Sequence, residues 1–452
     1  MSTQVHYIAV IGGAVSGSAT AFQFASRGIK TVIFDQQALP YGKIEDGLPK
    51  WHAKLRDKEE GKIDKRLAHP NITYVPNIRL GEAVTFEELC SWGFSAIVLA
   101  TGAFNDRPLP VDGVDEYLNK GFYYQNPFFI WYNHFHEPGY EGLKHEIVDD
   151  AVVVGGGLAS LDVVKALMIE SVKEKLLEKG HDVDMFTLDR SIVKVLDGLG
   201  YTLDDLGLKG CRLYYRRRTI DMPVTPMATD TPEALEKAQG IRAKLLNNFV
   251  KKYLFKFYEC HVPIGKIVKD GKLAGLVFQK TEVIDGKAAA IEGTEHDVES
   301  PLVISSIGSI PELLDGIPSQ WQMFKIADIN TCQIEGYDNV FAVGNAVTGQ
   351  GNIKESYKHG NELSERIMDE SLGWKEEHFE EYLRITESKV QDQASVIAEK
   401  FSGNNLLSVE KVAELDVKIA EMHKKSGYTG DYMSWRNANI PVRLEDMLGI
   451  EH

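Results

Sequence analysis

The chain opens on apolar runs that alternate with a helical repeat. Tyr7–Ile11 is apolar throughout, and Thr31–Phe34 is a second apolar run that ends on Asp35. Between them, apolar residues recur with a helical period to about Arg27. Short uninterrupted apolar runs are typical of strands that are buried on both faces of a parallel sheet. This stretch therefore predicts a strand, a helix and a second strand.

The same two patterns continue along the chain. Further strands are expected at 72–75, 96–100, 151–154, 262–268, 273–281, 298–307 and 340–343, and helices at 50–67, 86–90, 161–175, 231–249, 354–369, 379–401 and 409–424. Asp270-Gly271 and Asp285-Gly286 are hairpin turn signals, so we expect residues 262–307 to form a β-meander.

A glycine-rich turn joins the first strand to the first helix. It reads Gly12-Gly13-Ala14-Val15-Ser16-Gly17, with alanine in place of the usual middle glycine. The first glycine permits a sharp turn, the middle small residue lets backbone approach a pyrophosphate, and the third brings helix and strand close together. Asp35 follows at the distance where an acid accepts hydrogen bonds from a ribose diol. These features predict a dinucleotide site.

A second strand–glycine–helix turn follows the strand expected at 151–154. It contains Gly155, Gly157 and Ser160. We expect it to cradle a second pyrophosphate, because the N-terminus of a helix offers N–H groups and a positive dipole end to an anion.

Two segments compete to complete this second unit. Val183–Leu188 would be a strand ending at the acid Asp189, whereas Cys211–Tyr215 would be a strand ending at the arginines Arg216, Arg217 and Arg218. An acid at this place selects the free 2′-hydroxyl of NAD, and arginines accept the 2′-phosphate of NADP. The second alternative requires a largely helical insertion at 191–208. The sequence leaves both alternatives open.

Small residues and a glycine-containing loop follow several of the expected strands. Loops at the carboxyl ends of parallel strands are where α/β sheets bind ligands, so we expect these residues to line a nucleotide site. They are Gly47, Leu48, Thr101, Gly102, Gly344, Asn345, Gly351, Asn352 and Ile353.

Together these patterns predict an α/β fold of two nested Rossmann-like dinucleotide-binding domains with a helical C-terminal extension. We expect the first domain at 1–105 and 330–372, and the second, with the β-meander inserted, at 106–329. The extension at 373–452 shows no catalytic motif, and we expect it to pack on the main body or to form a contact between subunits.

Composition and charge disfavour several classes of function. The 452 residues include 43% hydrophobic and 26% charged side chains, with no secretory signal and no apolar run near the ~20 residues of a membrane span. A formal net charge of −16 gives nucleic acid no electrostatic footprint. The four cysteines form no C-x-x-C pair, which disfavours a disulfide framework, a zinc ribbon and a redox-active dithiol. We therefore expect a cytoplasmic protein without a membrane or nucleic-acid partner.

Two stretches carry further candidates. The mixed charges of residues 50–67 are typical of a solvated helix face, with a surface for a partner protein as the alternative. His134, His136 and His145 lie close in sequence, but no ligand set of known spacing accompanies them, so we assign no metal site.

Four local stretches carry a family resemblance. They are Phe129–Asn133, the loop Tyr41–Pro49, the Y-R-R…M-P spacing of Tyr215–Pro223, and Gly351-Asn352-Ile353. The first and last resemble the F-x-x-W-Y-N and G-x-I stretches of adrenodoxin reductase-type ferredoxin–NADP reductases. The third resembles the glutamate synthase small subunit, and the loop is similar to both. Over about residues 5–370 the chain thus resembles the FAD-dependent NAD(P)H oxidoreductases of this family.

The resemblance implies FAD and NADPH as cofactors, with NADH as the alternative. The first turn and its acid would hold the ADP part of FAD, and the loop residues would line its ribityl and isoalloxazine parts. The second turn would hold the NADPH pyrophosphate, with Arg216 and Arg217 on its 2′-phosphate. Asn345 stands where the family more often has Asp, and Asp35 where it more often has Glu.

The function that the resemblance implies is hydride transfer from NADPH to FAD, followed by electron transfer to a ferredoxin-like carrier. No catalytic side chain is assigned, because the flavin carries the chemistry. One alternative is an electron-input subunit of a larger complex, like the glutamate synthase small subunit, with the C-terminal helices as the dock. Another is a flavin-binding regulator without turnover. A homo-oligomer formed through the C-terminal helices also stays open.

Overall fold

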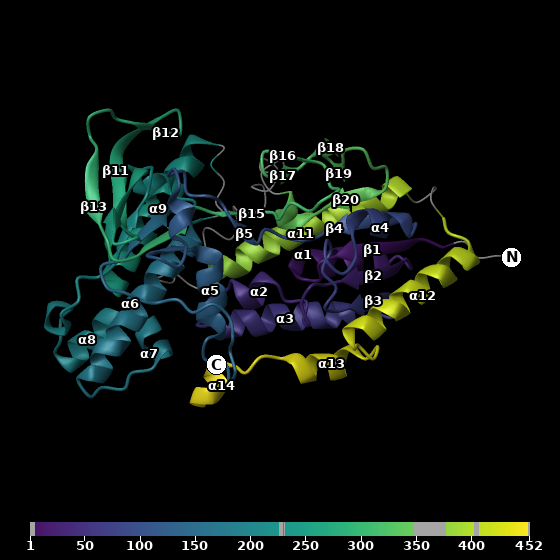
Figure 1. Ribbon diagram of the computed structural model, residues 1–452, viewed down its shortest axis with the longest axis horizontal. Helices are drawn as coiled ribbons and strands as arrows, with labels where there is room; N and C mark the ends of the chain where they lie inside the picture. The colour runs from purple at the N-terminus through teal and green to yellow at the C-terminus, as the bar shows by residue number, and fades with distance from the viewer. Residues whose placement is uncertain (1–4, 226–228, 230, 348–376, 402–405, 451–452) are drawn as a thin grey trace.

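The computed structural model describes residues 5–225, 229, 231–347, 377–401 and 406–450. Two sheets, each with five parallel strands, organise these residues, with helices packed against both (Figure 1). In addition to the main strands and helices, there are several short elements. These are β16 (Ser319–Gln320), β17 (Met323–Phe324), η1 (Val114–Tyr117), η2 (Asp204–Leu206), η3 (Thr219–Asp221) and η4 (Gly344–Ala346).

The first sheet has the strand order β18–β19–β20–β4–β1–β2–β3. The strands are β1 (Tyr7–Ile11), β2 (Lys30–Phe34), β3 (Ile72–Val75), β4 (Ala96–Leu99), β18 (Ile326–Asp328), β19 (Gln333–Ile334) and β20 (Val340–Ala342). The five strands from β20 to β3 are parallel, and β18 and β19 add to one edge in antiparallel pairing. Every residue of β1 is buried, as its apolar run predicts. The helices of this part are α1 (Val15–Ala25), α2 (Lys43–Asp46), α3 (Ala53–Leu67) and α4 (Phe86–Ser91).

The second sheet lies within the sequence span of the first. Its five parallel strands follow the order β6–β14–β7–β8–β9. They are β6 (Phe122–Tyr124), β7 (Val152–Gly155), β8 (Arg212–Tyr214), β9 (Lys256–Tyr258) and β14 (Val303–Ser306). The associated helices are α5 (Gln125–His134), α6 (Leu158–Glu178), α7 (Met185–Arg190), α8 (Ile192–Leu199) and α9 (Pro232–Tyr253). The nested α/β arrangement that the sequence predicts is confirmed.

The β-meander is present between β9 and β14, with one difference from the expectation. It consists of β10 (His261–Lys269), β11 (Lys272–Ile284), β12 (Lys287–Ala290) and β13 (His296–Glu299). The single strand expected at 298–307 is two strands, because β13 pairs antiparallel with β11 whereas β14 joins the parallel sheet beside β7. The residues between β13 and β14 therefore carry the chain from the meander to the parallel sheet.

The chain crosses between the two sheets twice, and the two crossings run side by side. Outward it passes through β5 (Asn105–Asp106), and it returns through β15 (Ser309–Ile310). These two segments pair antiparallel, with Ser309 opposite Asp106. Asn126 at the start of α5 donates from its side-chain amide to the carbonyl of Phe104 at 2.9 Å and to Ser309 Oγ at 3.1 Å. The crossings are thus tied to the second sheet.

The C-terminal extension packs on the main body. It comprises α11 (Glu377–Phe401), α12 (Val409–Ser426), α13 (Tyr432–Asn439) and α14 (Leu444–Leu448). In α11 the buried residues Val390, Ala394 and Ile397 recur at helical spacing and join the core cluster that holds α1. In α12, Leu415 and Ile419 join the cluster on the other face of the first sheet. In the described ranges, no helix combines the length and the apolar character that a membrane span needs.

Candidate functional site

A cavity of about 550 Å³ opens at the carboxyl ends of the first sheet and extends to the start of α6. It is lined at one end by residues that follow β1, β2 and β4, and at the other by residues of α5 and α6. Of the predicted site residues, those in its lining are Gly12, Ala14, Asp35, Gly47, Leu48, Thr101, Gly102 and Asn345. All eight were expected at the first nucleotide, and the cavity reaches the second glycine turn through residues of α6.

The first glycine turn has the backbone geometry that its sequence predicts. Gly12 has φ +97°, and a Cβ built there would lie 2.5 Å from the carbonyl oxygen of Ala100. A Cβ on Gly17 would lie only 1.7 Å from the carbonyl oxygen of Gly12, so this glycine lets α1 pack against the turn. Ala14 is the N-cap of α1 and supplies no side-chain cap. The first N–H groups of α1 are therefore left for another acceptor at the cavity.

Asp35 joins the turn to the end of β2. Its carboxylate accepts hydrogen bonds from the backbone N–H of Gly13 at 2.7 Å and of Gln37 at 2.9 Å. The side chain is buried, and this burial outweighs the hydrogen bonds and raises its pKa to about 6. Gly13 donates to this carboxylate but does not line the cavity. Asp35 accepts from the turn and also lines the cavity.

The loop after β2 forms one wall of the cavity. Tyr41, Lys43 and Ile44 line it together with the predicted Gly47 and Leu48. The ammonium group of Lys43 donates to Asn126 Oδ1 at 3.0 Å and to Ser309 Oγ at 2.9 Å, and thus reaches the crossing between the sheets. Its burial lowers the pKa of Lys43 to about 8.

The wall beside β4 and β20 contains a polar group without a partner. The hydroxyl of Thr101 is buried and has no hydrogen-bond partner among the described residues. Gly344 packs close to α1 instead, since a Cβ there would lie 2.1 Å from Ser16 Oγ. Gly351, Asn352 and Ile353, with the helix expected after them, lie outside the described residues.

The second glycine turn contributes to the cavity through the residues that follow it. Gly155, Gly157 and Ser160 are not in the lining, whereas Leu158, Ala159 and Asp162 are. A Cβ on Gly155 would lie 2.4 Å from the carbonyl oxygen of Ser306, so Gly155 is required for packing. A Cβ on Gly157 would meet no atom within 4 Å.

Asp162 is a buried acid that faces the cavity from α6. Burial raises its pKa to about 7, an effect that Lys165 on the next turn opposes. An acid with such a pKa can hold or release a proton near neutral pH.

The structure decides between the two candidate strand ends. β8 pairs in parallel with β7, so the arginines stand at the end of the neighbouring strand. The competing prediction of a strand at 183–188 is wrong, because residues 185–190 form α7, with Asp184 as its N-cap. Asp189 pairs with Lys165 instead of closing a strand. The helical insertion at 191–208 is confirmed by α8 and η2.

The three arginines differ in how they are engaged. Arg217 donates to Tyr215 Oη at 3.0 Å and to the carbonyls of Asp221 and Gly286 at 3.2 and 3.3 Å. Arg218 pairs with Asp221 at 2.8 Å. Arg216 is exposed, and no partner of its guanidinium is found among the described residues.

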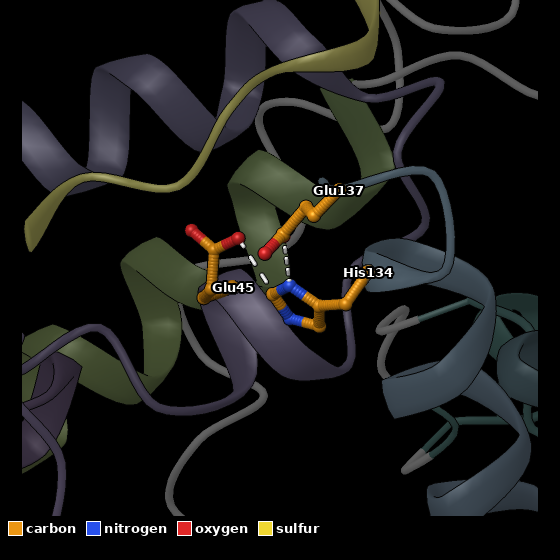
Figure 2. A group of neighbouring side chains, drawn as sticks. All are labelled: Glu45, His134 and Glu137. Atoms are coloured by element: carbon orange, nitrogen blue, oxygen red, sulfur yellow. Dashed lines mark hydrogen bonds and ion pairs between the residues drawn. The ribbon is translucent and has the colours of Figure 1, made fainter. Parts of the chain in front are cut away.

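A group of potential metal ligands lies where α2 meets the end of α5. One atom from each of Glu45, His134 and Glu137 lies within 4.8 Å of the others (Figure 2). Burial lowers the pKa of His134, but its hydrogen bonds to Asp46 and Glu137 outweigh this effect and raise the pKa to about 10. A protonated imidazole has no lone pair for a metal, and Arg443 already binds the Glu45 carboxylate at 2.6 Å. We interpret the group as ion pairs.

Sequence reasoning missed three parts of the lining. Lys43, Asp162 and Tyr382 line the cavity, the last with Leu383 and Thr386 of α11. Lys43 lies in the loop Tyr41–Pro49 and Asp162 lies two residues after Ser160, so each is close in sequence to predicted site residues and could have been included. The contribution of α11 carries no local signal, because its amphipathic pattern predicts packing and not its partner.

No family model matches the chain. In sequence it is 25% identical over 353 residues to the mitochondrial NADPH:adrenodoxin oxidoreductase of Arabidopsis thaliana, a match that covers 70% of each protein. It is 23% identical over 441 residues to the NADP(+)-dependent formate dehydrogenase subunit beta of Moorella thermoacetica, covering 93% of this chain and 52% of that protein. The chain thus spans 70% of the first relative and about half of the second.

In fold the chain resembles FprA of Mycobacterium tuberculosis in complex with NADPH. The TM-score is 0.66 at 20% identity, with 93% of this chain and 91% of the other covered. This likeness extends over both sheets. Sequence and fold together support the resemblance drawn from the motifs: the chain is similar to the NADPH-dependent flavoprotein oxidoreductases of the adrenodoxin reductase and glutamate synthase small chain group.

Proposed function

We propose that the protein is an FAD-dependent NADPH oxidoreductase that passes electrons to a ferredoxin-like carrier. The observation that carries this proposal is one cavity that residues following both glycine turns line, with Asp35 and Asp162 among them. Such a space lets two nucleotides meet. FAD would supply the capacity to take two electrons from NADPH and to release them singly.

The residues at the first turn fit a flavin dinucleotide. The uncapped N-terminus of α1 suits the diphosphate, and Asp35 suits a ribose diol. The hydroxyl of Thr101, which no described residue bonds, offers a further polar contact. Gly47, Leu48, Gly102 and Asn345 would line the ring and ribityl parts from the walls that they already form. We assign FAD binding to about residues 1–105 and 330–372. Tyr382, Leu383 and Thr386 of α11 line the same cavity.

The residues at the second turn fit NADPH better than NADH. The open space at Gly157 leaves room for a pyrophosphate at the start of α6. We assign NADPH binding to residues 106–329. Arg216 and Arg217 stand at the end of β8, where a 2′-phosphate is recognised. Asp189, the residue that would favour NADH, is paired with Lys165 on α6.

Anaerobic titration of the FAD-loaded protein with NADPH and NADH tests the proposal. We expect NADPH to bleach the flavin absorbance with at least a tenfold preference over NADH, a difference of about 1.4 kcal/mol. Reduction of ferricyanide and of a ferredoxin is then compared. A protein that stays colourless with FAD, or a bound flavin that NADPH does not bleach, contradicts the proposal, and the latter result favours the regulator without turnover.

A second function is favoured by one of the comparisons. The formate dehydrogenase subunit matches this chain over 93% of its length, so the likeness extends into the C-terminal extension. We therefore keep an electron-input subunit of a larger complex as the second proposal. Reduction of ferricyanide without reduction of ferredoxin would favour it, as would co-purification of the natural protein with a second chain on size exclusion.

A further inference from the structure

The C-terminal residues 435–445 run along the outside of the loop that forms one wall of the cavity. This loop, residues 36–49, contributes Gln36, Gln37, Tyr41, Gly42, Lys43, Ile44, Gly47 and Leu48 to the lining. In Figure 1, α13 and α14 lie along α3 at the lower edge of the view. Tyr432 at the start of α13 also packs edge-on against Tyr74 of β3. The contacts between the two segments fall at three separate points.

The first two points lie near the start of the loop. The indole N–H of Trp435 donates to the carbonyl of Ala38 at 2.8 Å. The guanidinium of Arg436 donates to Tyr41 Oη at 3.1 Å and to Asp64 at 2.7 Å. The hydroxyl of Tyr41 itself donates to Asp64 at 3.0 Å. Tyr41 is 1% exposed, and its hydroxyl bonds to both partners within the protein.

The third point lies at α2, near the end of the loop. Arg443 binds both oxygens of Glu45 at 2.6 Å with one guanidinium nitrogen, and Glu60 of α3 at 2.8 and 3.0 Å with the other. Glu60 is 2% exposed. Burial and the neighbouring Glu45 raise the pKa of Glu60, and Arg443, placed between the two carboxyl groups, opposes this shift. Glu45 stands between Ile44 and Gly47, which both line the cavity.

The residues on either side of Arg443 are anchored independently of the loop. Glu445 is fully buried and pairs with Arg56 of α3. The carbonyl of Val442 accepts a hydrogen bond from His136, which follows α5 of the second sheet, at 3.1 Å. The segment is therefore fixed to the body on both sides of the contact with Glu45, and it can hold the loop in place.

From these contacts we propose that residues 435–445 are a brace of the flavin site, in which Arg436 and Arg443 position Tyr41 and Glu45 and so shape the wall of the cavity. This inference rests on the proposed function and assigns a role to part of the extension. Coupling between two sites is reciprocal. FAD binding and docking of the brace must therefore strengthen each other.

The test compares FAD affinity in the full-length wild-type protein with that in Arg436→Met, Arg443→Met and the double variant. We expect FAD to bind at least tenfold more weakly to the double variant, measured by flavin fluorescence under conditions where the apo-proteins are folded. Arg443→Met leaves the Glu45 carboxylate without its guanidinium partner. Arg443→Met/Glu45→Gln removes that charge, and we expect part of the affinity to return. Lys58→Ala is the control, because its exposed pair with Glu380 joins α3 to α11 without touching the loop.

Hydrogen exchange supplies the second readout, which a merely structural role would not move. We expect FAD to slow amide exchange at 435–445 in the wild type. The proposal is contradicted if the double variant binds FAD within twofold of the wild-type affinity. It is also contradicted if amide exchange at 435–445 is the same with and without FAD. A wild type that takes up no FAD contradicts the proposed function instead, which keeps the two failures apart. Should the double variant not fold, the exchange measurement decides alone.

Discussion

The carboxylate of Asp35 and the backbone N–H of Gly13 are 2.7 Å apart, and this hydrogen bond closes the first glycine turn onto the end of β2. The same carboxylate lines the cavity. One side chain therefore both shapes the turn and presents an acceptor to whatever fills the space beside it. Asp35 is the residue through which the local structure and the proposed chemistry of the first nucleotide can be tested together.

Replacing Asp35 by Asn should weaken FAD binding by at least tenfold. An amide has one acceptor oxygen where a carboxylate has two, so Asn cannot serve Gly13 and a ribose diol equally well. Equilibrium dialysis or flavin fluorescence measures the change. Asp204→Asn, at an exposed position of η2, is the matched control. Equal affinities in the wild type and Asp35→Asn would place the adenosine ribose elsewhere.

Arg216 and Arg217 should give different defects when each is replaced by Met. Arg216 is exposed and available to a phosphate, so its loss should raise KM for NADPH at least tenfold and leave KM for NADH unchanged. Arg217 donates three hydrogen bonds within the protein, so its loss should lower the free energy of unfolding by about 1–3 kcal/mol. Steady-state kinetics and urea unfolding separate the two. A KM for NADPH that does not change in Arg216→Met contradicts the assignment.

Asp162 should make the stability of the apo-protein depend on pH. Its pKa is about 7 in the folded chain and 3.8 in the reference state, so between these values the folded state binds more protons than the unfolded state. The free energy of unfolding should therefore fall as pH rises from about 4 to 7, by about 1.4 kcal/mol per unit of pKa difference at most.

The variant Asp162→Asn isolates this effect. It should lose that part of the slope and be more stable than the wild type at pH 8, while the two proteins converge near pH 4. Urea unfolding of both proteins at several pH values is the measurement. Identical slopes in the two proteins would show that Asp162 is ionised throughout this range.

Two glycine-to-alanine variants should separate packing from ligand space. Gly17→Ala places a methyl group 1.7 Å from the carbonyl oxygen of Gly12, so we expect it to prevent folding or to lower the melting temperature sharply. Gly157→Ala meets no atom within 4 Å, so we expect a normal melting temperature and weaker NADPH binding. Thermal unfolding and NADPH titration check both. A Gly157→Ala protein with unchanged NADPH affinity would show that the pyrophosphate does not approach this turn.

The parts of the fold that depend on local pattern were predictable from the sequence. β1, α1 and β2 lie within a few residues of the expected ranges, because buried parallel strands and the glycine turn between them have strong local signatures. The segment 183–188 was ambiguous, because a short apolar run suits a strand and a helix equally. Only its capping residue Asp184 marks the start of a helix there.

The parts of the site that depend on distant contacts were not predictable. The charges of α3 read as a solvated face, yet Arg56, Glu60 and Asp64 are buried beneath the C-terminal segment. Nothing in residues 50–67 shows that Arg436 and Arg443, nearly 400 residues later, would pair with Asp64 and Glu60. Periodicity predicts which face of a helix is polar. It does not predict whether a second polar segment packs against that face.

The nesting of one sheet inside the other has a consequence for how the protein is made. All strands of the second sheet lie between residues 122 and 306, whereas the first sheet receives β20 only at residues 340–342. Domains form in the order in which the ribosome releases them. The second sheet can therefore fold on the nascent chain before β20 joins the first sheet, and the loop at 36–49 gains its contacts with residues 435–445 later still.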